Sequence, residues 1–271
     1  MSARRGRLVA TLRHELERTN FHGRTVTLAE GVAVSGAAAA LAALARRPAD
    51  AAVLVGIGVL GLADDLVEHR QRRAGRPVAK GLRGHVRALA AGRPTTGGLK
   101  LVGIPVLCLA GAARAEHPRL VLVDAALTAG CANLANLLDL RPGRALKASL
   151  MPAALLATLP VQDGGTAERA AGGRTLAIAA LLPALAALPV DLDERGMLGD
   201  AGANVLGAAV GTALARRTPP GVRLALLAGV VALTVASERV SFSAVIARTP
   251  WLERLDRIGR RADGPDEAGP A

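Results

Sequence analysis

Aromatic residues are almost missing from this 271-residue sequence, which has one Trp, two Phe and no Tyr. Proteins that bind single-stranded nucleic acid stack the bases on aromatic side chains, so the sequence argues against that partner. The same scarcity removes the aromatic belt that is usual at membrane interfaces. Only two cysteines are present, Cys108 and Cys131, and both fall inside apolar segments. They are too few for a disulfide framework and are interpreted as small buried apolar residues.

Acidic residues are in the minority, with 22 Asp and Glu against 34 Lys and Arg, for a formal net charge of +12. A basic nucleic-acid-binding protein is one interpretation of that charge. However, 51% of the residues are hydrophobic and the mean hydropathy is +0.33. The basic residues also fall in loops between apolar runs, as they do in membrane proteins. We therefore expect a lipid bilayer as partner and no nucleic acid. No cleavable signal peptide is expected, because the charged first 20 residues lack an apolar core.

Long apolar segments recur along the chain and predict an all-α fold, a polytopic helical bundle with about eight transmembrane helices. Their Ala and Gly content suits close helix packing in lipid and would permit a homodimer. We expect a cytoplasmic N-terminal segment over 1–30, a membrane-embedded domain over 31–260 and a disordered cytoplasmic tail over 261–271. The eight segments lie near residues 31–45, 51–63, 99–113, 120–138, 148–160, 174–190, 201–215 and 223–237.

Charge in the loops predicts the topology. The loop between Arg70 and Lys100 is rich in Arg and Lys, so the positive-inside rule makes it cytoplasmic. Alternation then places residues 1–30, 139–147, 191–200 and 239–271 on the same side. All the chemically unusual segments meet that side, among them "ADDLVEHR", "GRPTTGGLK", "NLANLLDLRPGRALK" and "MLGDAGANVLG". A multi-pass protein of the plasma membrane, with a site that faces the cytoplasm, follows from this pattern.

Four carboxylates lie at the ends of apolar segments on that side: Asp64, Asp65, Asp139 and Asp200. Ionisable groups at membrane depth are costly and are functional candidates by default. A cluster of carboxylates repels itself unless it holds a cation, and Mg²⁺ suits a site shared by carboxylates and substrate phosphates, with Mn²⁺ as the alternative. The other interpretation is that each Asp caps a helix or pairs with an Arg.

A cationic, Gly-rich loop lies beside the acids in the sequence. Lys80 and Lys100 flank "PTTGG", in which Gly97 and Gly98 would let backbone amides approach a phosphate and Thr95 and Thr96 add hydroxyl groups. The alternative is that these cations only set the topology and attract anionic lipid. Metal, cations and a Gly-rich loop together favour phosphoryl transfer.

These motifs resemble the polyprenyl-phosphate sugar-1-phosphate transferases, which include the phospho-N-acetylmuramoyl-pentapeptide transferase and the enzymes that load N-acetylglucosamine-1-phosphate on undecaprenyl phosphate. The resemblance covers about residues 20–260. It rests on five segments that keep the family's order: "NFHGRTV" with the Gly31 that follows, "GLADDLVE", "KGLRGH", "NLANLLDLRPG" and "MLGDAGANVLG".

The resemblance implies an enzyme that transfers a sugar-1-phosphate from a UDP-sugar to a polyprenyl phosphate with release of UMP, for cell-wall or surface-glycan synthesis. It implies that Asp64 and Asp65 lie at the reaction centre and that Asp200, together with Asp65, binds Mg²⁺. Lys80 would hold a phosphate. The amides Asn133 and Asn136, with Asp139, would hold the nucleotide or its diphosphate.

The sequence departs from the family pattern in three places, the first being that no apolar span precedes "NFHGRTV", where the family commonly has one. Pro142 stands where the family has a second Asp three residues after the first, and the last loop, "VIARTPWLERLDRIGRR", lacks the family's His cluster. A catalytically weak relative is therefore one alternative. An intramembrane aspartyl peptidase that uses two membrane aspartates is another, and a transporter or scaffold without chemistry is a third.

Overall fold

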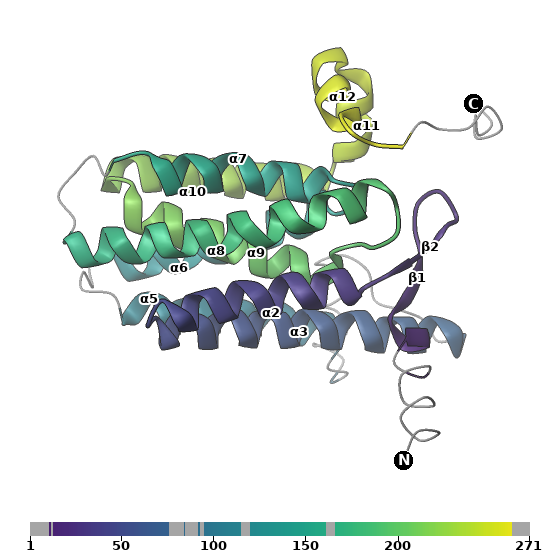
Figure 1. The fold of residues 1–271 in the computed structure, drawn as a ribbon, viewed down its shortest axis with the longest axis horizontal. Helices are drawn as coiled ribbons and strands as arrows, with labels where there is room; N and C mark the ends of the chain where they lie inside the picture. Colours follow the sequence, from purple (N-terminus) through teal and green to yellow (C-terminus); the bar gives the residue numbers. More distant parts are fainter. Residues whose placement is uncertain are drawn as a thin grey trace.

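The computed structural model describes residues 13–75, 95–114, 120–160 and 166–261, together with the isolated residues 11, 84 and 92. Lys80 and the tail beyond Arg261 lie outside the described residues, so the predictions for them are not assessed. The described chain is mostly helical (Figure 1). Each of the eight predicted apolar segments forms a helix: α2 (Ala29–Leu44), α3 (Pro48–Arg73), α5 (Thr96–Ala113), α6 (Val121–Leu138), α7 (Arg144–Thr158), α8 (Ala167–Leu192), α9 (Gly199–Arg217) and α10 (Pro220–Ser237).

Smaller elements flank the bundle. The strands β1 (Glu17–Thr19) and β2 (Thr25–Thr27) form an antiparallel hairpin in which Arg18 pairs with Val26. This hairpin departs from a purely helical fold, and its short polar strands show no alternation that would have announced it. After α10 the chain forms two short helices, α11 (Phe242–Arg248) and α12 (Pro250–Arg257).

Four of the described helices are long and apolar enough to cross a membrane, namely α5, α6, α8 and α10. The fold therefore fits an all-α membrane protein. Among the others, α2 has 16 residues and α7 has 15, which is short for a hydrocarbon core of about 30 Å. Helix α3 has 26 residues but ends in a charged stretch, and α9 has charged residues at both ends.

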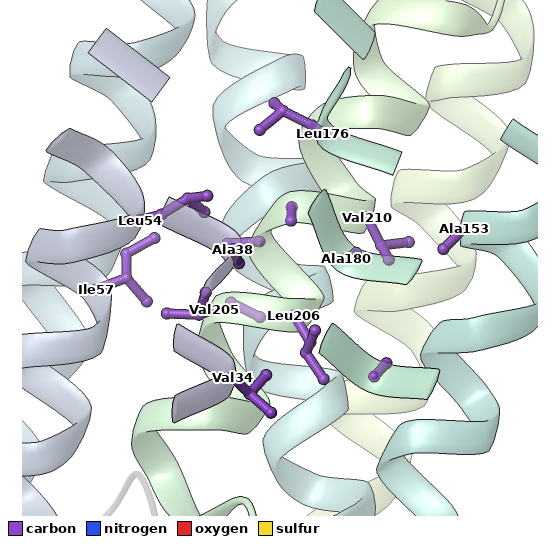
Figure 2. Close-up of a cluster of buried hydrophobic side chains, with 14 of the residues drawn as sticks. Val34, Ala38, Leu54, Ile57, Ala153, Leu176, Ala180, Val205, Leu206 and Val210 are labelled. Carbon is purple, nitrogen blue, oxygen red and sulfur yellow. The ribbon is translucent and has the colours of Figure 1, made fainter. Parts of the chain in front are cut away.

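Helix α9 lies at the centre of the bundle and packs against α2, α3, α6, α7 and α8. Figure 2 shows its Val205, Leu206 and Val210 among buried side chains of the surrounding helices. Ala and Gly residues bring the neighbours close. A Cβ atom on Gly207 would lie 2.3 Å from the carbonyl oxygen of Cys131 in α6, so only glycine permits this approach.

Polar contacts gather at the two ends of the bundle. One end holds the β1–β2 hairpin, α11 and α12, at the right of Figure 1. There, the amide of Met197 donates to the carbonyl of Thr27 at 3.1 Å, and Arg144 donates two 2.8 Å hydrogen bonds to Asp256. The segments predicted to share one face contact each other at this end.

Candidate functional site

The acids at the end of α3 meet the start of α9. Asp65 Oδ2 accepts a 2.9 Å hydrogen bond from the backbone N–H of Asp200. The helices come this close because Gly61 lies one turn earlier in α3. A Cβ atom at Gly61 would lie 2.5 Å from the carbonyl oxygen of Asp200. Glycine in the "GLADD" motif therefore brings the two acidic motifs together.

Helix α5 supplies a hydroxyl and an ammonium group to the same acids. Thr96 Oγ1 donates to Asp64 Oδ1 at 2.6 Å. Lys100 Nζ lies 3.5 Å from Asp64 Oδ2 and also donates to Asp200 Oδ2. Thr96 and Lys100 are four residues apart and so share one helix face. The Lys100 ammonium group thus lies between two carboxylates, where it offsets their mutual repulsion.

Thr95 and Gly98 begin α5. The Thr95 hydroxyl caps the helix by accepting a 3.0 Å hydrogen bond from the Gly98 N–H. That amide, which the sequence predicted for phosphate binding, is therefore engaged within the chain. Gly97, by contrast, lines the cavity described next.

A cavity of about 380 Å³ opens beside Asp64 and Lys100, between α5, α6 and α10. Its polar end also holds Asn133 and Asn136, which lie three residues apart and so share one face of α6. Thr234, Ser237 and Glu238 of the α10 end also line it, and its apolar lining includes Leu101, Ile104, Pro105, Leu137 and Val235. The cavity thus combines a charged end with a long apolar wall.

Asp139 does not line this cavity. Helix α6 ends at Leu138, and Asp139 lines a neighbouring cavity of about 510 Å³ with Asn20, Arg141 and Asp191. Burial raises the pKa of Asp139 well above its ordinary value, and the negative charges of Asp191, Asp200 and Asp65 add to that shift. The structure therefore separates Asp139 from Asn133 and Asn136, which the sequence had grouped with it.

Two site residues are absent from the sequence predictions. Asn204 lines the main cavity, is 1% exposed, and donates a 2.5 Å hydrogen bond to the carbonyl of Asp200. Its position four residues after Asp200, inside "GDAGAN", is the signal that marks it. Arg18 of β1 donates to the backbone carbonyl of Asp65 at 2.9 Å. Its partner is 47 residues away, and no local pattern indicates that contact.

In the part of the chain that the structure describes, no group of three or more His, Cys, Asp and Glu side chains has the arrangement of a metal site. Asp64 and Asp200 nevertheless both contact one cationic group, the Lys100 ammonium. Carboxylate oxygens are the donors that Mg²⁺ prefers. Two carboxylates that could bind a cation therefore converge here, and in this structure the Lys100 ammonium group lies between them.

Comparison of the chain with family models, curated proteins and solved structures gives no match.

Proposed function

We propose that this protein is a membrane phosphosugar transferase that moves a sugar-1-phosphate from a UDP-sugar to a polyprenyl phosphate of the undecaprenyl type and releases UMP. The observation that supports this proposal is the meeting of three distant motifs in one place. The motifs that converge at one end of the bundle are Asp64 with Asp65, Thr96 with Lys100, and Asp200. Asp64 and Lys100 also line the cavity between α5, α6 and α10.

The proposed step is one phosphoryl transfer. An oxygen of the polyprenyl phosphate attacks the β-phosphorus of the UDP-sugar, and a new P–O bond forms. The bond between the β-phosphorus and the oxygen that bridges to the α-phosphorus breaks, and its electron pair leaves with UMP. The products are a polyprenyl diphosphate sugar and UMP. A phosphate monoester is already largely ionised near neutral pH, with a second pKa of about 6, so no strong base is required.

The chain's own residues have separate roles in this step. Asp64 would act as a base when the lipid phosphate is still protonated. Thr96 fixes the Asp64 carboxylate through its 2.6 Å hydrogen bond. Asn133 and Asn136, at the polar end of the cavity, would donate hydrogen bonds to phosphate oxygens or to the nucleotide. Lys100, already within reach of both acids, would neutralise the entering phosphates.

Asp64, Asp65 and Asp200 would hold the divalent cation. Bound Mg²⁺ would neutralise the charge that develops on the transferred phosphoryl group. The Asp65 carboxylate accepts a hydrogen bond from the backbone N–H of Asp200, and this bond holds the two acidic motifs together. The Lys100 ammonium group, which contacts Asp64 and Asp200, would have to move aside when the cation binds.

The apolar wall of the cavity suits the acceptor. Its apolar lining includes Leu101, Ile104 and Pro105 of α5, Leu137 of α6 and Val235 of α10. A prenyl chain beside these residues would keep its phosphate at the charged end, near Asp64. The proposal also includes eight membrane crossings of a plasma membrane, with both chain ends and the active end in the cytoplasm.

An intramembrane aspartyl peptidase would use two aspartates around a shared water. In this chain the Lys100 ammonium group contacts both Asp64 and Asp200. The other oxygen of Asp64 accepts a hydrogen bond from the Thr96 hydroxyl. Such a cationic environment favours phosphate chemistry over a carboxyl dyad. A requirement for Mg²⁺ would separate the two, since the peptidase needs no metal.

The decisive experiment measures UMP release by the purified protein in detergent or vesicles, with a panel of UDP-sugars and undecaprenyl phosphate. We expect UMP and a lipid-linked product with at least one donor. Asp200→Asn should lower the rate by about 100-fold or more while the protein stays folded. Asp193→Asn is the matched control, because the Asp193 side chain is 60% exposed at the same bundle end. Equal rates for both variants, or no UMP with any donor, would refute the proposal.

A further inference from the structure

The bundle end opposite the proposed active site holds a second group of buried charges. Asp124 of α6 accepts hydrogen bonds from Arg169 of α8 at 2.6 Å and from Arg223 of α10 at 3.0 Å. Asp50 of α3 accepts two bonds of 2.6 Å from Arg216 of α9. Each of these five side chains is at most 12% exposed. Five helices are therefore joined through one buried ionic cluster.

The cluster has one positive charge in excess, because three guanidinium groups face two carboxylates. A buried charge without a counterion is strongly unfavourable. The nearby Glu168 does not supply the missing charge, since its side chain is 73% exposed and lies 3.8 Å from Arg47. Among the described residues, the buried part of the cluster thus lacks one negative charge.

A small, partly open cavity of about 30 Å³ lies within this cluster. Its polar lining consists of Asp50, Asp124, Thr128, Arg169, Thr212 and Arg216. That volume suits one monatomic ion or one to two water molecules. It is too small for a phosphate ester or a carboxylic acid with a carbon chain.

One buried hydrogen-bond donor of the lining side chains remains open. Nη1 of Arg169 is buried and has no hydrogen-bond partner among the described residues. The carboxylate oxygens of Asp50 and Asp124 already accept from guanidinium groups. The Thr212 hydroxyl donates to the carbonyl of Ala208 at 2.8 Å, and its oxygen lies 3.5 Å from the hydroxyl oxygen of Thr128. A ligand here would have to accept hydrogen bonds and bring negative charge.

We propose that this cavity binds a small monovalent anion, chloride, which bonds to Nη1 of Arg169 and completes the charge of the cluster. The anion stabilises the junction of α3, α6, α8, α9 and α10. This inference is independent of the transferase proposal, because none of its residues belongs to the proposed active site.

Thermal unfolding of the full chain in detergent tests the proposal. The midpoint is measured as sodium chloride replaces sodium gluconate at constant ionic strength, since gluconate is too large for the cavity. We expect the midpoint to rise with the logarithm of the chloride concentration, by about 5 °C when chloride reaches about 100 times its dissociation constant. Bromide should produce a similar rise. Equal midpoints in chloride and gluconate, as expected if the cavity holds only water, would overturn the proposal.

Two variants locate the effect. Arg169→Met leaves Asp124 paired with Arg223 and makes the cluster neutral, so the chloride-dependent shift should disappear. Arg217→Met is the matched control: Arg217 donates to the carbonyls of Ala170 and Leu159 at the same end but does not line the cavity. It should retain the shift. If Arg169→Met does not fold, line broadening of the ³⁵Cl resonance by the wild-type chain reports binding directly, and no broadening refutes it.

Discussion

Gly61 controls the distance between the two acidic motifs, and a single methyl group at this position tests that role. In Gly61→Ala the new Cβ atom would lie 2.5 Å from the carbonyl oxygen of Asp200 and 2.7 Å from the Cα of Ala201. Both are backbone atoms, so no side chain can move aside. Lengthening the shorter contact to the 3.4 Å of ordinary van der Waals packing requires α3 and α9 to separate by roughly 0.9 Å.

That separation has two measurable consequences. Overpacking of this kind costs about 1–3 kcal/mol, which lowers the unfolding midpoint by roughly 5 °C. It would also stretch the 2.9 Å bond from the Asp200 amide to Asp65 towards ~3.8 Å, beyond hydrogen-bonding distance. A misplacement of about 1 Å in a catalytic group can lower a rate by about 100-fold. We therefore expect a moderate loss of stability and a larger loss of UMP release.

Gly56→Ala provides the control on the same helix. Its Cβ would meet only the end of the Leu107 side chain, at 2.9 Å, and that flexible side chain can rotate. Both variants are compared by thermal unfolding in detergent and by UMP release. If Gly61→Ala unfolds at the same temperature as Gly56→Ala and is equally active, the close approach of α3 and α9 does not set the site geometry.

Three further perturbations probe the site and its surroundings. In Lys100→Met, calorimetry should show Mg²⁺ binding about tenfold tighter, because no ammonium group competes for Asp64 and Asp200, while UMP release falls; unchanged or weaker binding would contradict this. EDTA should abolish transfer and added Mg²⁺ should restore it, whereas activity that persists in EDTA would argue against metal assistance. Burial opposes ionisation of Glu194, but hydrogen bonds from His22 and Asn20 outweigh it and hold the pKa of Glu194 below its ordinary value of 4.5. Its carboxylate therefore stabilises the fold fully above about pH 4.5 and loses that contribution as pH falls through the lower folded pKa. Glu194→Gln should unfold at a lower temperature than wild type near pH 7, and the gap should narrow below pH 4.5; a constant gap would refute the assignment.

The helices could be predicted from the sequence because each one is a long apolar run between polar loops. Antiparallel alternation of these runs also predicted that Asp64, Asp65 and Asp200 would lie at one end of the bundle. The central place of α9 was not predictable in this way. A helix that is enclosed on all sides has no polar stripe, and its Ala and Gly residues resemble those of its neighbours.

The site was predictable in its residues but less so in its pairings. Lys100 was expected to meet a phosphate, and the chain instead surrounds its ammonium group with two carboxylates, one of them 100 residues away. The family resemblance grouped Asp139 with Asn133 and Asn136 in one motif. Helix α6 ends before Asp139, so the spacing of a continuous helix no longer applies to it. Contacts of this kind depend on where helices end and cross, which local patterns do not encode.

The enclosure of α9 has a consequence for how the chain is made. Helices α2, α3, α6, α7 and α8 precede it along the nascent chain, and all of them surround it in the folded protein. With Asp200 near one end and Arg216 and Arg217 near the other, α9 is a poor substrate for release into lipid by the insertion machinery. We therefore expect the five earlier helices to leave a gap for α9 during synthesis, so that Asp200 reaches Asp65 only in a late step of folding.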